Sequence, residues 1–374
     1  MGVTFEEDSI IGDMLFHKSE LALYGKLIKY NRLDYLLQLA FGNTPIKSVN
    51  IFIDFHQMIY TLYRFNTIND PMGVLASMVN MILHYRHYFN KKAIKSNIFV
   101  IFSTNNSANN LKYIANYNSG YIKKREANQN IKEIIDKNIE LMKTLIPYFP
   151  GIYLKLSAVE PSVVMYDIIN KISKKDHSPC LVISSSDYAY QLPAVLRNTF
   201  LIYKKTMLNA NKTNTEDVSF IVSHDNTLLT YISKIKNQQI TMDDLQDSVL
   251  LNQNWISPFI ILTGLQCRNV KALFNYKKAL NILKYIKNNF NIITPESLYD
   301  AIIDLNNGKL VKLQKQEIID RYCALDLDYQ LKLYRELPES IEVSWLQDLY
   351  DPQTLYEIVN NYFKGQNRIE LGKL

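Results

Sequence analysis

The stretch VNIFIDF (residues 49–55) combines β-branched and aromatic residues and carries an acid next to its end. A short apolar run of this kind is typical of a buried strand in a parallel sheet. NIFVIFS (97–103) and CLVISS (180–185) repeat the form, and TFLIYKK (199–205) is a further candidate. Helical patterns lie between these runs, over 72–90, 126–146 and 160–174. Strands that alternate with helices predict an α/β fold with a Rossmann-like, mostly parallel sheet.

The sequence on either side of this core predicts helices. Residues 6–42 carry apolar side chains at helical spacing, and a Gly and a Pro follow in Gly42-Asn43-Thr44-Pro45. Beyond residue 225 we expect no further strand, and helices are predicted over 225–237, 242–252, 256–264, 276–289, 295–306, 315–335 and 352–364. The expected organisation is an N-terminal helical extension (1–45), an α/β core (46–225) and a helical region (226–374).

The composition excludes several classes of protein. With 47% hydrophobic and 21% charged residues, the 374-residue chain can bury a large core, which excludes general disorder. The net charge of +6 permits nucleic acid as a partner without requiring it. Three separated cysteines without a CxxC pair argue against a disulfide framework or a zinc site. The sequence shows neither a signal peptide nor a run of roughly 20 apolar residues, so we expect a soluble protein that is not secreted and has no membrane partner.

Acids and serines end the predicted strands. Asp54 closes the first strand, Ser103 the second, and Asp187 follows a triple serine after the third. In a parallel sheet, ligands gather beyond the carboxyl ends of the strands. Carboxylates there suit Mg²⁺ or Mn²⁺, but phosphodiester hydrolysis by two ions about 4 Å apart needs a cluster of them.

The order of the segments resembles that of the flap endonuclease and polymerase I 5′-nuclease superfamily, over about residues 49–285. The matching segments are VNIFIDFHQMIYTLYR (49–64), NIFVIFS (97–103), AVEPSVVMYDI (158–168), CLVISSSDYAYQL (180–192) and FIILTGLQCRNVKALFNYKKALNIL (259–283). The positions of Gln191-Leu192 and Leu262-Thr263-Gly264 contribute most to the resemblance. It implies a PIN-like core over 46–225, a helix-hairpin over about 256–289, and metal-dependent cleavage of DNA.

The chain departs from the superfamily at most of the metal-binding acids. Asp54 matches the acid that ends the first strand of the relatives. Glu160 matches the Glu of the helix start that follows their second strand. Ser103 stands where the second strand of the relatives ends in Asp, and the helix start Glu160-Pro161-Ser162-Val163 lacks both Asp residues that follow this Glu in the superfamily.

The two later motifs are altered further. When the sequences are aligned on Gln191-Leu192, Ser186 and Tyr188 occupy the acid positions and Asp187 lies between them. In the last motif Leu265 and Arg268 replace acids. Neutral residues weaken the negative field that holds divalent ions, and Arg268 opposes it.

We therefore predict a nuclease fold without nuclease chemistry, with no metal site and no cofactor. The vestigial candidates are Asp54, Glu160 and Asp187. Each also has a structural interpretation: Asp54 as a hydrogen-bonded remnant, Glu160 as an acid at a helix start, and Asp187 as a turn or N-cap residue.

Basic residues are the candidates for nucleic-acid binding. Lys271, Lys277 and Lys278 lie in and after the hairpin turn, which lacks the glycines of the relatives, and Lys123-Lys124-Arg125 lies where the relatives contact DNA. These lysines and arginine could meet phosphates or form solvated charge clusters.

Three other patterns have mainly structural interpretations. His84 and His87 lie three apart on a predicted helix without a further ligand nearby, and His224-Asp225 favours a helix start. Tyr113, Tyr117 and Tyr121 are spaced by four, which fits a packed stripe or stacking on bases.

Three functions follow as hypotheses. The first is a non-catalytic structural or interaction subunit that binds protein partners in a nucleoprotein or virion assembly, in host cytoplasm or virion. The abundance of Tyr, Asn, Ile and Lys is compatible with a phage, another virus or an AT-rich bacterium, and it bears on origin only. The second is a divergent nuclease that uses Asp54, Glu160, Asp187 and Asp167 with a single Mg²⁺ or Mn²⁺. The third is metal-independent DNA binding. None of them involves a small-molecule substrate.

Overall fold

The fold was determined as a computed structural model. It describes residues 28–29, 46–55, 58, 71–103, 113–114, 133, 137, 140, 152–156, 159–175, 177–208, 215–236, 251, 255–265, 268–290, 292–306, 314–336 and 341–344, and the statements below concern these residues.

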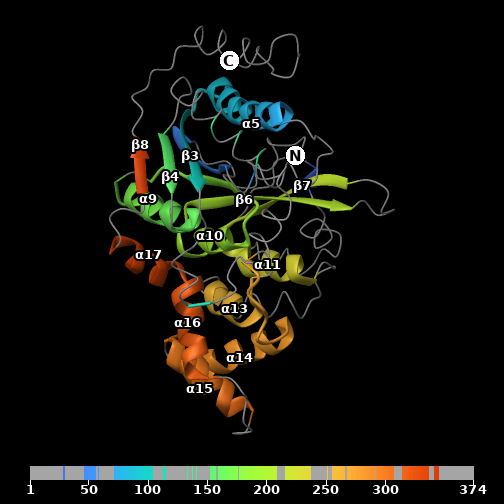
Figure 1. The fold of residues 1–374 in the computed structure, drawn as a ribbon, viewed down its shortest axis with the longest axis vertical. Coiled ribbons are helices and arrows are strands. Elements are labelled where there is room, and N and C mark those ends of the chain that lie inside the picture. Colours follow the sequence, from blue (N-terminus) through green and yellow to red (C-terminus); the bar gives the residue numbers. More distant parts are fainter. Residues whose placement is uncertain are drawn as a thin grey trace.

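The described strands form one sheet of eight, in the order β1-β7-β6-β5-β2-β3-β4-β8 (Figure 1). The parallel centre consists of β6 (Thr199–Leu208), β5 (Cys180–Ser184), β2 (Ser48–Asp54), β3 (Lys95–Ser103) and β4 (Ile152–Leu156). The antiparallel additions are β7 (Thr215–Val222) and β1 (Ile28–Lys29) on one side and β8 (Ile341–Ser344) on the other. The predicted α/β class and mostly parallel sheet are confirmed.

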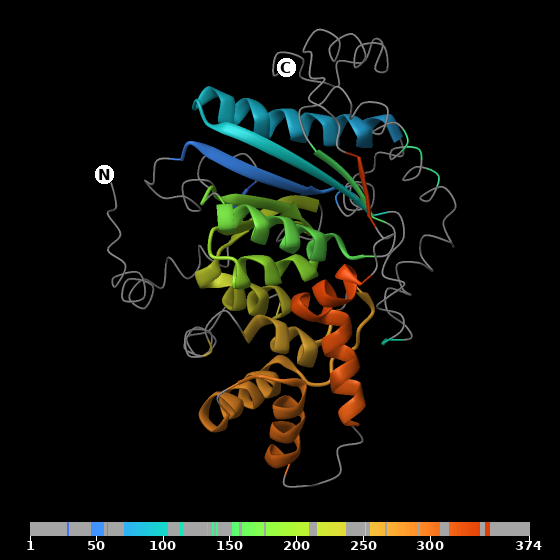
Figure 2. The ribbon, with the colours of Figure 1, turned by 90° about the vertical axis from the view of Figure 1, so that its left-hand side faces the viewer.

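The middle of the sheet is buried. All five residues of β5 are buried, and so are the residues of β2 that follow Ser48. In Figure 2, α5 (Pro71–Lys91) covers one face of the sheet, and α9 (Pro161–Lys175) lies on the other. Because both faces are covered, apolar residues follow one another along these strands without alternation. Phe52 of β2 stacks on Phe99 of β3 with ring centroids 4.5 Å apart.

Short helices and turns connect the sheet to the helical region. η2 (Asp187–Tyr190) and α10 (Gln191–Val195) follow β5, and η3 (His224–Asn226) and α11 (Thr227–Lys236) follow β7. The side chain of Gln191 donates a hydrogen bond of 2.8 Å to the carbonyl of Leu325, which joins α10 to the helices beyond the core.

The helices that follow α11 form the lower region in Figure 2. They are α13 (Ile256–Thr263), α14 (Tyr276–Asn289), α15 (Pro295–Leu305), α16 (Lys315–Leu325) and α17 (Leu327–Arg335). The side chain of Asn275 caps α14, and Thr294 caps α15 with Pro295 at its first turn. α17 returns to the core and contacts α9. None of the described helices is both long and apolar enough to cross a bilayer.

The structure corrects four expectations about the elements. Residues 315–335 form two helices, because Asp326 has an extended backbone (φ −84°, ψ 133°) that ends α16 and begins α17. β1 lies within the segment predicted as N-terminal helices, and β8 lies beyond residue 225, where no strand was expected. β4 and β7 were also not predicted. β1, β4 and β8 pair with strands distant in sequence, which local periodicity does not report, whereas β7 pairs with β6, the strand directly before it.

Several predictions fall outside the described residues. They include the helices over 242–252 and 352–364 apart from Leu251, which is helical, and most of 126–146, of which residues 133, 137 and 140 are helical. The division of the chain at residues 45 and 225 stays a prediction.

Candidate functional site

The candidate site lies at the carboxyl edge of the parallel strands. Asp54 ends β2, Ser103 ends β3 and Ser184 ends β5, while Glu160 follows β4 directly before α9. Because these strands are parallel, their ends meet at one edge, where ligands bind in folds of this class. The structure thus brings the predicted positions to one edge of the sheet.

Asp54 is buried at the end of β2 and is hydrogen-bonded to the turn that follows β5. Its exposed fraction is 1%, and the hydroxyl of Ser184 donates to its Oδ2 at 2.9 Å. The same hydroxyl accepts the backbone N–H of Ser186 at 3.0 Å, and the Ser186 hydroxyl accepts the N–H of Tyr188 at 3.3 Å. The triple serine therefore shapes the passage from β5 into η2 and satisfies one oxygen of Asp54.

Glu160 forms an ion pair with Arg268. The Nη2 of Arg268 lies 2.7 Å from Oε2 of Glu160, and the two side chains are 7% and 2% exposed. Arg268 belongs to the turn between α13 and α14, 108 residues away in sequence. A buried carboxylate needs a counter-charge, and in this chain an arginine supplies it.

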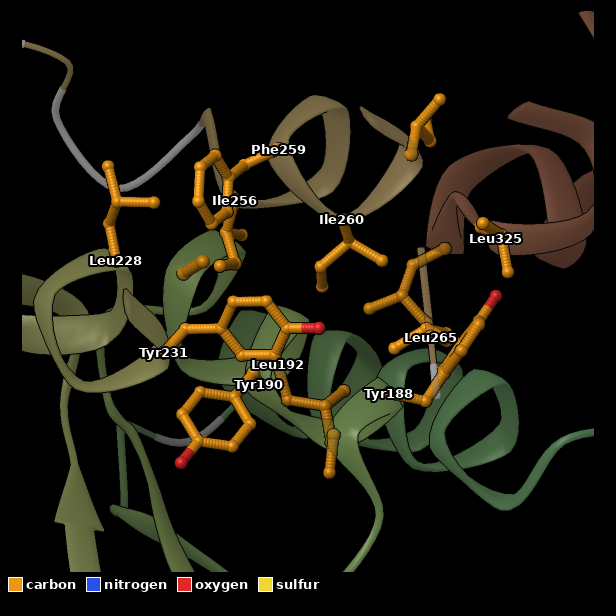
Figure 3. Packing of buried hydrophobic residues seen from close by; sticks show 14 of the residues in the cluster. Tyr188, Tyr190, Leu192, Leu228, Tyr231, Ile256, Phe259, Ile260, Leu265 and Leu325 are labelled. Atoms are coloured by element: carbon orange, nitrogen blue, oxygen red, sulfur yellow. The ribbon is translucent and has the colours of Figure 1, made fainter. Parts of the chain in front are cut away.

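Tyr188 and Leu265, at two other positions where the superfamily carries acids, are fully buried. Figure 3 shows both among the packed residues, with Leu325 close to Tyr188. Burial raises the pKa of the Tyr188 phenol well above its usual value, with further increases from Glu160 and Asp326 and a decrease from Arg268. Tyr188 is therefore a neutral core residue that lies near the Glu160–Arg268 pair.

Asp187 is held by a different set of partners. The hydroxyl of Tyr203 donates to its Oδ1 at 2.7 Å, and Lys234 of α11 forms an ion pair with its Oδ2. The ammonium of Lys234 also lies 5.2 Å from the ring centroid of Tyr231. Burial and Asp187 together raise the pKa of the neighbouring Tyr190. Both carboxylate oxygens of Asp187 are thus engaged with β6 and α11.

Asp167, the additional acid of the single-metal hypothesis, joins α9 to α17. Its oxygens lie 2.6 Å from Nζ of Lys171 and 3.0 Å from Nη2 of Arg335. Burial raises the pKa of Asp167, but the two cations outweigh burial and hold this pKa below its usual value. Asp167 therefore acts as a structural ion-pair residue.

The carboxylates do not fit a metal centre. A group of three or more His, Cys, Asp and Glu side chains that could hold a metal ion does not occur within the described residues. Glu160, Asp167 and Asp187 each face a different arginine or lysine. Paired divalent ions need several carboxylates that converge on them, and this donor set is divided among organic cations.

The turn between α13 and α14 is fixed at several points. Gly264 has φ +72°, and a Cβ at this position would overlap the carbonyl oxygen of Val270. Leu265 and Val270 form an isolated antiparallel bridge. Arg321 of α16 donates to the carbonyl of Lys271 at 2.9 Å. Together with the Glu160–Arg268 pair, these contacts hold the turn against both the core and α16.

The structure describes three of the six basic residues predicted to bind nucleic acid. Lys271, Lys277 and Lys278 are exposed on this turn and on the first turn of α14, and Nζ of Lys278 donates to Asn306 at 2.9 Å. Lys123, Lys124 and Arg125 lie outside the described residues.

His84, His224 and Tyr113, from the other sequence patterns, contact neighbouring protein groups. His84 is exposed and contacts the ring of Tyr85, and His224 begins η3 with its Nδ1 3.1 Å from the carbonyl oxygen of Pro193. Tyr113 packs against the core, whereas Tyr117 and Tyr121 lie outside the described residues.

Sequence reasoning missed the partners of the acids. Ser184, Tyr203, Lys234 and Arg335 contact the candidate carboxylates but carry no motif of their own. The motif comparison did point to Arg268, as a cation at an acid position, but not to its contact with Glu160.

Comparisons with known proteins return similarities of structure. No family model matches the sequence, and no curated protein matches it. A flap endonuclease of bacteriophage T5 in complex with DNA and metal ions has a TM-score of 0.49 and 12% identity, with 84% of this chain and 97% of that chain covered. Human GEN1 in complex with Holliday junction DNA has a TM-score of 0.42 and 9% identity, with 84% and 67% covered.

The catalytic core of Rad2 in complex with DNA has a TM-score of 0.40 and 10% identity, with 92% and 93% covered. These identities are low and these TM-scores lie below 0.5, so the similarity conveys no function. The chain is similar to flap endonucleases and related nucleases, the proteins whose motif order its sequence resembles.

Proposed function

We propose that this chain is a catalytically degenerate 5′-nuclease-like protein that acts as a structural or interaction subunit. The buried ion pair between Glu160 and Arg268 is the observation on which the proposal rests. An arginine neutralises the carboxylate at the position where a nuclease of this type would direct a carboxylate at metal ions.

The remaining acids support the same proposal. Asp187 is engaged with Tyr203 and Lys234, and Asp54 accepts the Ser184 hydroxyl. Tyr188 and Leu265 place uncharged, buried groups where acids would be needed. Because these acids already have partners, they do not together provide the negative field that concentrates divalent ions.

A cleavage assay tests the loss of catalysis. The pure protein is incubated with a labelled 5′-flap DNA and Mg²⁺ or Mn²⁺, with an active flap endonuclease as positive control. We expect no cleavage above the background of a mock purification. Cleavage that Asp54→Ala abolishes would establish the divergent nuclease instead, since a contaminating nuclease would not respond to this substitution.

The partners in this proposal are proteins of a viral nucleoprotein or virion assembly, located in the host cytoplasm or in the virion. A scaffold without catalysis can still recognise a partner through aromatic residues, which concentrate binding energy at interfaces. Affinity purification from a nuclease-treated lysate of the natural source tests this. Stoichiometric co-purification of a defined protein without DNA is expected, and recovery of the chain alone would contradict it.

Metal-independent DNA binding is the second candidate, favoured by the exposure of Lys271, Lys277 and Lys278 on one turn and the helix that follows it. Fluorescence anisotropy with labelled flap and single-stranded DNA tests it over a range of salt concentrations. Changing the three lysines to Gln is expected to weaken binding and to reduce the salt slope by up to about 3. Lys315→Gln, at an exposed position on α16, is the matched control.

A further inference from the structure

The Glu160–Arg268 pair joins two parts of the molecule that are distant in sequence. Glu160 lies between β4 and α9, and Arg268 lies in the turn between α13 and α14. Both side chains are withdrawn from solvent, with exposed fractions of 2% and 7%. The contact therefore connects the α/β core to the helical region through one charge-assisted hydrogen bond of 2.7 Å.

A carboxylate in such a place must be neutralised. It can take up a proton, bind a metal ion or face an organic cation, because an isolated buried charge is very unfavourable. The surroundings distinguish among these partners. Tyr188 and Leu265 are both fully buried and lie in the hydrophobic core cluster. Arg268 acts to lower the pKa of the Tyr188 phenol.

These surroundings favour a guanidinium over a divalent ion. Mg²⁺ is reluctant to lose its water molecules and usually keeps several of them. A guanidinium is planar and weakly hydrated, and it donates directional hydrogen bonds to a carboxylate. Apolar and aromatic neighbours are compatible with the guanidinium and offer little to a hydrated metal ion.

We infer that Glu160 forms a cation site selective for guanidinium, which the chain fills with its own Arg268. In this way Arg268 takes the structural place of a bound ion and holds its own turn, between α13 and α14, to the core. The inference deepens the proposed loss of metal chemistry and rests on it for the interpretation of the site. Its test has a different readout, the thermal stability of the protein.

Chemical rescue tests the inference. Arg268→Ala removes the guanidinium that pairs with Glu160, so we expect the melting temperature to fall by roughly 5–10 °C, as for a broken buried ion pair. Low-millimolar guanidinium chloride should then recover part of this loss, relative to NaCl at the same ionic strength. MgCl₂ at that ionic strength should recover none of it.

Two further variants make the result specific. The double variant Glu160→Gln/Arg268→Ala lacks the anion and should show no shift with guanidinium. Arg335→Ala removes an arginine from the Asp167 pair, in which the arginine side chain is 59% exposed. It should lower the melting temperature less and show no recovery, because exposed pairs contribute little. This variant also reports the weak general destabilisation by guanidinium.

Several results of the melting-temperature measurements would contradict the inference. Equal shifts in the single and double variants, no shift in either, or an equal response to MgCl₂ would each contradict a guanidinium-selective site. If Arg268→Ala is recovered only unfolded, refolding yields in guanidinium and in NaCl are compared, and equal yields count against the inference. Cleavage of DNA by the unmodified protein would overturn the proposed function, whereas failed rescue with no cleavage would overturn the guanidinium site alone.

Discussion

Two buried tyrosines near the sheet edge differ in what their hydroxyl groups contact. The Tyr203 hydroxyl donates to Asp187 at 2.7 Å, whereas the Tyr188 hydroxyl has no hydrogen-bond partner among the described residues. A buried polar group without a partner lowers stability, while one that donates to a charged acceptor raises it. Removal of the hydroxyl group should therefore affect stability differently at the two tyrosines.

Tyr188→Phe is expected to leave the free energy of unfolding unchanged or to raise it by up to about 1 kcal/mol, because it removes an unpaired hydroxyl from the core. Tyr203→Phe, the matched comparison, should lower it by about 1–3 kcal/mol. Urea unfolding followed by circular dichroism measures both. A larger loss for Tyr188→Phe than for Tyr203→Phe would show that the Tyr188 hydroxyl has a stabilising partner.

Gly264 is the residue at which a side chain is least tolerated in the α13–α14 turn. Its φ of +72° and the adjacent carbonyls of Val270 and Lys271 leave no room for a Cβ. Gly264→Ala is expected to cost at least about 1–3 kcal/mol of unfolding free energy, through backbone strain and displacement of the turn. Ala272→Gly, at an exposed position of the same turn, should change it by less than about 1 kcal/mol. Equal effects in chemical denaturation would contradict this account.

At the scale of elements, α17 is attached by acids in two different environments. Asp167 of α9 pairs with Arg335 of α17, and Tyr166 donates to Asp328 at 2.8 Å. Asp326 caps α17 through the N–H groups of Asp328 and Tyr329 and accepts the Ser257 hydroxyl at 2.5 Å. Burial nevertheless dominates these hydrogen bonds and raises the pKa of Asp326, whereas the pKa of Asp167 is lowered.

The two acids should affect the pH dependence of stability in opposite directions. The contribution of Asp167 is present above its unfolded-state pKa of about 3.9 and is lost as the pH falls through its lower folded-state pKa. The contribution of Asp326 is present below about pH 3.9 and is lost as the pH rises through its higher folded-state pKa.

Unfolding free energies from pH 3 to pH 7 measure this, with each variant compared to the unmodified protein. Asp326→Asn should become relatively more stable as the pH rises through the folded pKa of Asp326, and Asp167→Asn relatively less stable as the pH rises toward about 4. Asp300→Asn, at an exposed site on α15, is the control. The same sign of change for Asp326→Asn and Asp167→Asn would contradict the assigned environments.

The sequence predicts an element well where the residues that determine it lie close together in the chain. Helix α14 was predicted over its full extent because its apolar spacing lies within one short segment. β8 pairs with β4, almost 200 residues earlier, and its four residues show no decisive pattern. The break at Asp326 was missed because apolar periodicity continues across it, while the extended backbone depends on contacts with Ser257.

At the scale of the whole molecule, sequence indicated acids that lie at the sheet edge but not the residues that contact them. The motif order located Asp54, Glu160 and Asp187, and the substitutions at other acid positions argued against a metal pair. The partners of these acids come from distant elements, as Arg268 and Lys234 illustrate. Side-chain pairing across the fold depends on packing, which local sequence patterns do not encode.

The sheet should exchange its amide hydrogens unevenly. β2 and β5 lie in the middle with ladders on both sides, and their residues are buried, whereas β1 and β8 lie at the two ends of the described sheet. Native-state hydrogen exchange should therefore give protection factors in β2 and β5 that approach those of global unfolding, and roughly 10-fold or more lower ones in β1 and β8. Uniform protection across all these strands would contradict this gradient.

The position of β8 has a consequence for synthesis on the ribosome. The edge of β4 has its antiparallel neighbour in residues 341–344, which are made almost 200 residues after β4 itself. A nascent chain stalled before this point would display an unpaired strand edge, a known template for intermolecular association. Late arrest of translation should thus yield fragments that associate with one another and need chaperones, until residues 341–344 have left the ribosome and paired with β4.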